Sequence, residues 1–261
     1  MNNFINLLRR FYILIITLFL YIPIAVLIGL SFNASDARSV WGGFTWDWYF
    51  TLLDSHVILE ALKNTLTIGF LSATVATLIG LAAAIGITGM RRRNYAIVLG
   101  LGNIPMLNAD IVTGIILMLT ITRFIELGYF SILLAHITFS IPYVVMCILP
   151  RLKSMDMSIY EAARDLGADA FTAFRKVMLP HLMPAVLGGF FIALTMSMDD
   201  FVVTYFTKGA GIDTLSTMIY GELKRGIKPE MYALSSVIFF LALFILIIVN
   251  YLPDWKKKVR P

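Results

Sequence analysis

Six long apolar runs constrain this chain more than any other feature of its sequence. They cover residues 11–32, 62–88, 95–122, 130–149, 184–206 and 231–252. A helix needs about 20 residues to cross a hydrocarbon core about 30 Å thick, because each residue rises about 1.5 Å. Since 59% of the 261 residues are hydrophobic and only 14% are charged, the sequence predicts an all-α, polytopic transmembrane bundle of six spans, formed by one domain over residues 1–261.

The third run is the least regular of the six. Pro105, Asn108 and Asp110 interrupt its apolar residues. A re-entrant break at this point is the alternative to a continuous helix, and it would reduce the number of crossings to five.

Basic residues at the ends of the runs predict the orientation, because Lys and Arg are retained on the cytoplasmic side. With a cytoplasmic N-terminus, 14 of the 21 Lys and Arg residues fall in inside segments. We therefore expect a multi-pass protein of the cell inner membrane with both termini in the cytoplasm. The net charge of +5 then faces anionic membrane lipid and requires no nucleic-acid partner.

The sequence lacks the common motifs of nucleotide binding and hydrolysis. A G-x-x-x-x-G-K-[ST] loop, a nucleophile elbow and an H-E-x-x-H motif are all absent. Cys147 is the single cysteine, and His56, His136 and His181 are scattered, so we expect no metal site and no cofactor bound by this chain. We expect that this chain is not an enzyme. An intramembrane enzyme and an ion-coupled secondary transporter are the less favoured alternatives. The second is less favoured because such transporters often have two halves with matching hydropathy, and none are found in this sequence.

Two outer segments, 33–61 and 207–230, separate the runs on the opposite side. The first contains Trp41, Trp46 and Trp48 around a helix-compatible stretch, which favours a membrane boundary, with a protein partner as the alternative. The second is rich in glycine and is expected to be irregular until Pro229 opens the last helix.

A polar, helix-prone segment at residues 151–180 lies on the cytoplasmic side of this topology. Ser158 and Glu161 predict a capping box at the start of one helix, and Gly167 predicts its end. Asp169 predicts the cap of a second short helix through residues 170–177.

The surface of this segment is suited to docking another protein. Ala162 and Ala163 allow close approach, while Tyr160, Phe171 and Phe174 supply apolar area. An amphipathic hairpin lying on the membrane surface is the alternative.

This segment resembles the EAA signature of ABC importer permease subunits. The residues that carry the resemblance are Glu161, Ala162, Ala163, Gly167, Leu179 and Pro180. The resemblance implies the type I permease fold of binding-protein-dependent importers. It also implies that residues 151–180 form the coupling loop, which contacts a cytoplasmic ATPase.

Three further stretches resemble spermidine/putrescine importers, especially their second permease subunit. They are GFTWDWYFTLL, HITFSIPYVV with the following RLKSMD, and SMDDFVVTYFTKG. One departure is Asn108-Ala109-Asp110, where the family usually has Ser-Pro-Asp. The implied partners are a second permease subunit, an ATPase dimer that uses ATP and Mg, and an extracytoplasmic polyamine-binding protein; a permease for ferric iron or an organic cation is the alternative.

Acidic residues within the predicted spans are candidates for the substrate path, because a carboxylate in a bilayer is costly. Asp110 and Asp199 each lie 15 residues after the start of their run, which places both about 22 Å along their helices. Adjacent helix positions diverge by about 100°, so one of Asp199 and Asp200 is expected to bond a neighbouring helix or partner instead. Tyr143 or Tyr205 is expected to add a cation-π contact.

Overall fold

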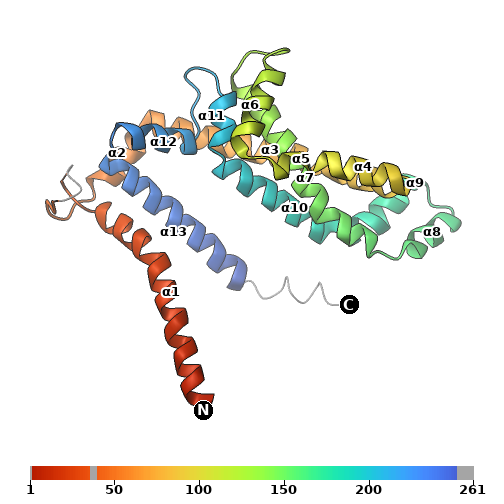
Figure 1. The fold of residues 1–261 in the computed structure, drawn as a ribbon, viewed down its shortest axis with the longest axis horizontal. Helices are drawn as coiled ribbons and strands as arrows, with labels where there is room; N and C mark the ends of the chain where they lie inside the picture. The colour runs from red at the N-terminus through yellow and green to blue at the C-terminus, as the bar shows by residue number, and fades with distance from the viewer. Residues whose placement is uncertain (1, 36–39, 252–261) are drawn as a thin grey trace. The chain divides into compact units, whose positions relative to one another are not determined.

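The computed structural model describes residues 2–35 and 40–251, which are helical apart from turns and one isolated bridge between Asn33 and Phe44 (Figure 1). The all-α prediction is confirmed for these residues. The chain divides into two compact units. Unit 1 comprises Met1–Leu59 and Ile219–Pro261, and unit 2 comprises Glu60–Met218.

Four helical stretches among the described residues are long and apolar enough to cross a membrane. They are Arg9–Leu30, His56–Thr88, Tyr129–Lys153 and Ala170–Asp199. Two shorter apolar helices, Asp110–Ile121 and Pro229–Leu241, fall in the third and sixth predicted runs. The number of six crossings therefore stays a prediction.

Unit 1 is built on two long helices and a compact turn. Its helices are α1 (Asn2–Leu30), α2 (Asp47–Asp54), the start of α3 (His56–Thr88), the end of α12 (Leu215–Arg225) and α13 (Pro229–Tyr251). Both α1 and α2 contact α13. Outer segment 33–61 thus contains α2 and the first turn and a half of α3.

The buried side chain of Asn33 organises the turn after α1. Its Nδ2 donates to the Val40 carbonyl at 2.8 Å, and its Oδ1 accepts from the Gly42 amide at 2.8 Å. Trp48 Nε1 donates to the Asn33 carbonyl at 2.8 Å. Part of the aromatic content of this segment therefore has a structural role, while Trp41 remains 61% exposed.

Unit 2 contains the other helices. They are the rest of α3, α4 (Arg92–Gly102), α5 (Ile104–Leu107), α6 (Asp110–Ile121), α7 (Tyr129–Lys153), α8 (Met157–Asp165), α9 (Ala170–Ala173), the π-helical turn η1 (Phe174–Met178), α10 (Leu179–Asp199), α11 (Val202–Thr207) and the start of α12.

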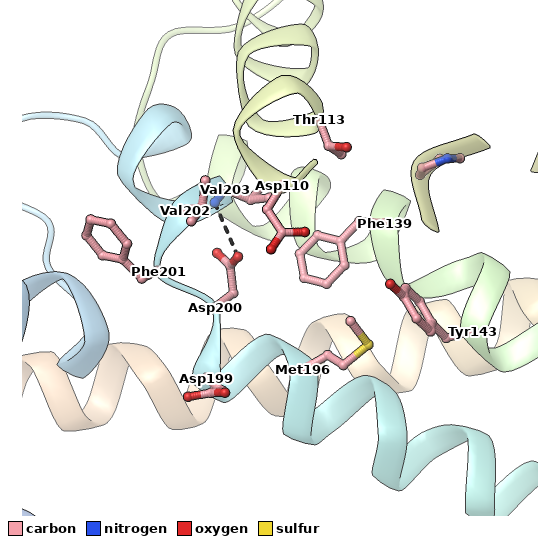
Figure 2. A pocket seen from close by; sticks show the side chains of 11 residues that line it. Asp110, Thr113, Phe139, Tyr143, Met196, Asp199, Asp200, Phe201, Val202 and Val203 are labelled. Carbon is pink, nitrogen blue, oxygen red and sulfur yellow. Dashed lines mark hydrogen bonds between the residues drawn. The ribbon is translucent and has the colours of Figure 1, made fainter. Parts of the chain in front are cut away.

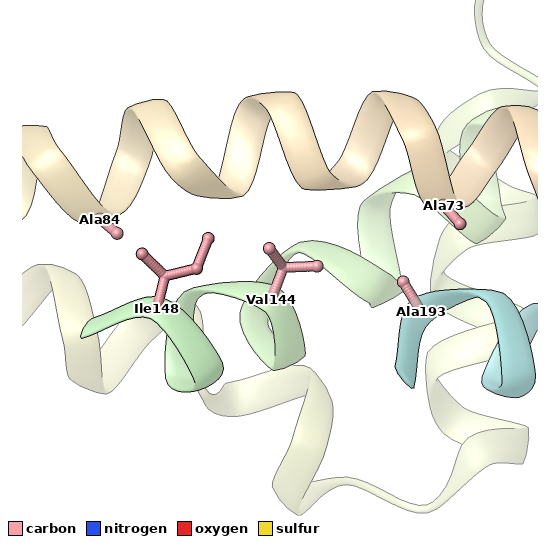
Figure 3. Packing of buried hydrophobic residues seen from close by; sticks show 5 residues of the cluster. All are labelled: Ala73, Ala84, Val144, Ile148 and Ala193. Carbon is pink, nitrogen blue, oxygen red and sulfur yellow. The ribbon is translucent and has the colours of Figure 1, made fainter. Parts of the chain in front are cut away.

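The core of unit 2 is formed where α7 packs against α3 and α10. A cluster of small and branched side chains lines this contact: Ala73, Ala84, Val144, Ile148 and Ala193 (Figure 3). Val144 fits against two glycines. A Cβ added at Gly80 would lie 2.6 Å from Val144 Cγ1, and one at Gly189 would lie 3.2 Å from it. Small residues let helices approach closely, which drives helix association in lipid.

The third run is broken, so the expectation of one continuous helix is wrong, and its proline and polar residues lie at the break. Pro105 lies in the first turn of α5, where its missing N–H removes no hydrogen bond. Asn108 and Ala109 then adopt extended backbone with ψ of 153° and 140°. Asp110 begins α6 after this break.

The fifth run differs from the prediction at both ends. The helical stretch predicted to start at Pro184 already begins at Ala170, because α9, η1 and α10 follow one another without a turn. The prediction of a separate short helix over residues 170–177 is therefore wrong. The Pro180 ring would clash with the carbonyl four residues earlier, and a wider π turn at residues 174–178 accommodates it. The helix also stops at Asp199, since Asp200 is extended with ψ of 123°.

The second outer segment contains a regular helix, so the expectation of an irregular course is wrong for residues 215–225. Its glycines with left-handed backbone lie outside the helix, at Gly211 (φ +80°) and Gly226 (φ +106°). The helix α13 begins at Pro229, as predicted.

Candidate functional site

The first helix of the 151–180 segment begins at a cap that was not predicted. Asp156, not Ser158, is the N-cap of α8, and its carboxylate accepts a 3.0 Å hydrogen bond from the Ser158 amide. The predicted capping box of Ser158 and Glu161 is therefore wrong, because the helix starts before Ser158. Hydrogen bonding from the backbone and side chain of Ser158 holds the pKa of Asp156 below its ordinary value.

The end of α8 is a glycine-dependent turn. The Ala168 amide donates to the Ala163 carbonyl and the Gly167 amide to the Arg164 carbonyl, at 3.1 and 3.0 Å. This is the Schellman pattern, and Gly167 adopts the left-handed conformation at φ +90°. The prediction that Gly167 ends the helix is confirmed.

Asp169 caps the next helix, as predicted. Its Oδ2 accepts from the amides of Phe171 and Thr172 at 3.1 and 3.2 Å. Hydrogen bonding from the Thr172 side chain and amide, and then from Phe171, lowers the pKa of Asp169. Two acidic caps and the Gly167 turn thus define a helix-turn-helix.

The outward apolar surface of this segment differs from the predicted one. Tyr160 and Phe174 pack inward against a cluster of Leu152, Met155, Met178 and Leu182. Of the three predicted aromatic residues only Phe171 is exposed, at 67%, together with Ile159 at 59% and Leu166 at 89%.

The EAA residues divide between this surface and the following helix. Glu161, Ala162 and Gly167 are exposed and Ala163 is half-buried. Leu179 and Pro180 lie in the first turn of α10. An exposed apolar face outside the apolar runs is typical of a protein-docking surface.

A second feature of unit 2 is a cavity of about 300 Å³, called here the acid cavity (Figure 2). It lies where the third and fifth runs break. Its lining consists of Pro105, Asp110, Thr113, Phe139, Tyr143, Met196, Asp199, Asp200, Phe201, Val202 and Val203. The structure thus brings together four of the five predicted path residues, whereas the half-exposed Tyr205 does not line this cavity.

Asp199 and Asp200 both reach the cavity because the helix ends between them. The argument that successive residues diverge by about 100° applies only inside a continuous helix. Figure 2 shows the Asp110 and Asp200 side chains directed into the same space, with Asp199 at the end of α10.

Asp200 is firmly held by its surroundings. Its carboxylate accepts from the amides of Val203 and Thr204 at 3.2 and 2.7 Å, and from the Thr204 hydroxyl at 2.8 Å. Its Oδ2 lies 3.5 Å from His136 Nε2. Asp200 therefore caps the N-terminus of α11, and it lines the acid cavity at the same time.

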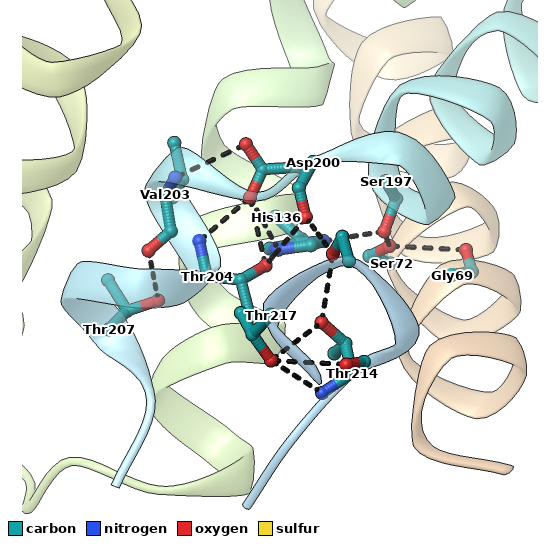
Figure 4. A network of polar contacts seen from close by, with 11 residues as sticks. Gly69, Ser72, His136, Ser197, Asp200, Val203, Thr204, Thr207, Thr214 and Thr217 are labelled. Carbon is teal, nitrogen blue, oxygen red and sulfur yellow. Dashed lines mark hydrogen bonds and ion pairs between the residues drawn. The ribbon is translucent and has the colours of Figure 1, made fainter. Parts of the chain in front are cut away.

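The buried imidazole of His136 joins three helices around Asp200 (Figure 4). Its Nδ1 lies 2.6 Å from Ser197 Oγ on α10, and its Nε2 lies 2.9 Å from Thr204 Oγ1 on α11. Ser197 is also hydrogen-bonded to Ser72 Oγ on α3 at 2.9 Å. The scattered positions of the histidines argue against a metal site, and the sequence predicted no other role for His136. A lone histidine within an apolar run was the available signal, because buried polar groups need partners.

The side chains of Asp110 and Asp199 differ from that of Asp200, because neither carboxylate forms a hydrogen bond or ion pair within the part of the chain that the structure describes. Thr113 Oγ1 also lines the cavity and is buried without a hydrogen-bond partner. The cavity therefore offers two carboxylates and one hydroxyl to a polar ligand. Over residues 2–35 and 40–251, no group of three His, Cys, Asp or Glu side chains could hold a metal ion.

The sequence profile of one family, described as the binding-protein-dependent transport system inner membrane component, matches residues 76–258. The chain belongs to this family. It is therefore an inner membrane component of a binding-protein-dependent transport system.

Several relatives cover almost the whole chain. It is 42% identical over 254 residues to the spermidine/putrescine transport system permease protein PotC of Escherichia coli K12, covering 97% of this chain and 96% of that protein. The identity to PotC of Haemophilus influenzae is 38%, covering 92% and 94% of the two chains. The putrescine transport system permease protein PotI of Escherichia coli K12 is 34% identical, with 93% and 89% covered.

Solved structures confirm the permease fold expected from the resemblance. A bacterial ABC transporter involved in alginate import superimposes with a TM-score of 0.73 at 18% identity, covering 100% of this chain and 97% of that one. The MetNI methionine ABC transporter gives a TM-score of 0.59 at 18% identity, with 79% and 95% covered.

Proposed function

We propose that this chain is a permease subunit of an ATP-driven importer and forms half of the translocation path for polyamines such as spermidine and putrescine. The observation that carries the proposal is the acid cavity, which gathers Asp110, Asp199 and Asp200 in unit 2. The near full-length similarity to PotC and PotI supports this substrate class.

The cavity suits a molecule with separated positive charges. Asp110 and Asp199 lie on different helices and are both exposed to the cavity side of the protein. Each can attract one ammonium group, and the Tyr143 ring can contact the cation or its methylene chain. Asp200 contributes negative charge but is hydrogen-bonded to α11, so we assign it to shaping the site.

The path sites should bind weakly. A cation that is held tightly in the membrane is released slowly, and conduction requires binding that the ligand can leave. We therefore assign tight selection to an extracytoplasmic binding protein and transient contact to Asp110 and Asp199.

The 151–180 segment would transmit closure of an ATPase dimer to the spans. The exposed face formed by Ile159, Leu166 and Phe171 supplies apolar contact, and Glu161 supplies a charge.

The complete importer would contain a second permease subunit and two ATPase subunits that use ATP and Mg. Six crossings with both termini in the cytoplasm follow if α6 and α13 complete the third and sixth spans, and reporter fusions after Arg93, Lys153 and Pro261 test this topology.

Uptake of labelled spermidine and putrescine by the reconstituted complex tests the substrate assignment. Asp110→Asn and Asp199→Asn preserve size and remove charge, so uptake should fall about tenfold or more, with assembly and basal ATPase activity retained. Glu126→Gln is the matched control, because this exposed acid does not line the cavity. Normal uptake in both aspartate variants, or uptake of an unrelated solute in place of polyamines, would contradict the proposal.

A further inference from the structure

A larger cavity lies at the end of unit 2 that carries the 151–180 segment. Its volume is about 960 Å³, within the range of ligand-binding pockets. It is lined by the ends of the long helices α3 and α7 and by the first turn of α4. The helices α4, α8 and α9 lie together at this end in Figure 1. We call it the methionine cavity.

The wall of the methionine cavity is apolar and adaptable. Four methionines line it: Met90, Met155, Met157 and Met178. Methionine is unbranched and has three rotatable bonds, so it accommodates irregular and flexible apolar ligands. A small hydrated anion would gain nothing from such a wall.

The cavity also contains two cationic side chains and no carboxylate. Arg92 and Lys153 both belong to its lining. Lys153 Nζ donates to Tyr95 Oη at 2.6 Å and lies 4.4 Å from the centre of the Tyr95 ring, so this ammonium group is held in place. Among the described residues, neither Arg92 nor Lys153 forms an ion pair with an acid. The nearest acid in sequence, Asp156, accepts from the Ser158 amide.

We propose that the methionine cavity binds one anionic phospholipid. The lipid phosphate lies between Arg92 and Lys153, and an acyl chain lies among the methionines. Basic pockets between helices at the cytoplasmic boundary are the sites where anionic lipid headgroups bind. Both α3 and α7 leave their apolar runs at this cavity, which places it where a headgroup and a chain are available together. The proposal depends on the membrane location of the chain and is independent of its substrate.

Binding at this cavity would influence the segment that docks the ATPase. Tyr160 of α8 lines the cavity and also packs on the cluster of Leu152, Met155, Met178 and Leu182. An acyl chain against the same side chains restricts the movement of α8 relative to α7 and α10. ATP-driven uptake should then depend on anionic lipid.

The test uses the assembled importer in nanodiscs of phosphatidylcholine with or without phosphatidylglycerol. Retained phosphatidylglycerol is measured by mass spectrometry after transfer to detergent, and a photoactivatable phosphatidylglycerol identifies the contacted peptides. Arg92→Gln with Lys153→Gln should reduce retention by about 30-fold, as expected when two basic contacts at the membrane surface are lost. Arg93→Gln is the matched control, because its side chain is the same but does not line the cavity.

A second variant tests the apolar half without removing charge. Ala96 is exposed and lines the cavity, so Ala96→Phe fills space at a position where folding tolerates it. It should also reduce retention and labelling near Met155, with ATPase association unchanged. Three results would overturn the proposal. An equal loss of retained phosphatidylglycerol in Arg93→Gln would show general attraction to the surface, and displacement of the lipid by inorganic phosphate would show a site for soluble anions. Photolabelling of ATPase peptides instead of the cavity peptides would show that a protein contact covers this surface.

Discussion

Replacing His136 by leucine should destabilise unit 2, because the imidazole makes polar contacts with three other side chains. Leucine keeps most of the apolar volume of the imidazole but removes both ring nitrogens. Ser197, Thr204 and Asp200 would each lose one partner. The variant therefore isolates the polar contribution of His136.

The structure limits the magnitude of this loss. Ser197 retains Ser72, and Thr204 and Asp200 retain each other, so no group becomes fully unpaired. Two neutral hydrogen bonds contribute about 1 kcal/mol each, and a contact with a carboxylate adds about 1 kcal/mol at the long distance of 3.5 Å. A total of about 3 kcal/mol corresponds to a Tm decrease on the order of 10 °C for a chain of this size.

His181 provides a matched control from the same sequence. Its Nε2 is buried and has no hydrogen-bond partner among the described residues. Removing an unsatisfied polar atom costs no hydrogen bond, so His181→Leu should leave the Tm unchanged or raise it. His136→Gln, which keeps hydrogen-bonding atoms, should recover part of the loss.

Thermal unfolding of the purified complex in detergent measures both histidine variants, and hydrogen exchange of α11 reports the local effect. Protection of the Val203 and Thr204 amides should fall in His136→Leu because Asp200 is less well held. A His136→Leu protein that unfolds at the same temperature as His181→Leu, with unchanged exchange in α11, would refute the argument that this network stabilises unit 2.

Three further predictions concern single positions. Gly80→Ala places a methyl group 2.6 Å from Val144 Cγ1 and should cost about 1–3 kcal/mol in thermal unfolding, with partial rescue by adding Val144→Ala; absence of rescue would contradict the packing argument. Gly167→Val forces a β-branched residue to φ +90°, so the amount of ATPase recovered in a pull-down and the rate of uptake should both fall, while the Tm stays unchanged. Recovery of the normal amount of ATPase would refute the role of this turn in docking. The pKa of Asp169 is lowered, so its cap stabilises α9 fully above the unfolded pKa, and this stabilisation is lost as pH falls through the folded pKa. Hydrogen exchange of the α9 amides should therefore lose protection at acid pH in the wild type but not in Asp169→Asn. The same pH dependence in both proteins would exclude this role.

Periodicity and local chemistry predicted the parts of the fold that depend on neighbouring residues. Apolar length located the helices, and Gly167 and Asp169 located the turn in the 151–180 segment. Pro105 and Asn108 marked the position of the break in the third run, although a continuous helix was the favoured expectation there. Each of these signals acts over a few residues, through backbone hydrogen bonds or left-handed geometry.

The errors arose where tertiary contacts override local preference. Asp200 carried a local signal that was not used, because Asp is a favoured helix cap and its carboxylate accepts the Val203 and Thr204 amides. Its contact with His136, which is 64 positions away in the chain, could not be read from neighbouring residues. Tyr160 and Phe174 were expected to face outward, but they pack against the apolar cluster of Leu152, Met155, Met178 and Leu182. Such choices depend on partners that a single sequence does not reveal.

The two helix breaks explain how the membrane part of this protein tolerates its acids and why they should bind cations weakly. Asp110 lies in the first turn of α6, and Asp200 accepts amides at the start of α11, so both carboxylates face the positive end of a helix. Gly114 lets α6 approach α11 closely, since a Cβ there would lie 3.0 Å from the Phe206 ring. Each helix terminus offsets part of the negative charge, which stabilises the carboxylate in a site of low polarity and lowers its attraction for an ammonium group. Asp199 lies at the C-terminal end of α10, where the helix dipole adds negative potential, and it should therefore be the stronger of the two cation contacts.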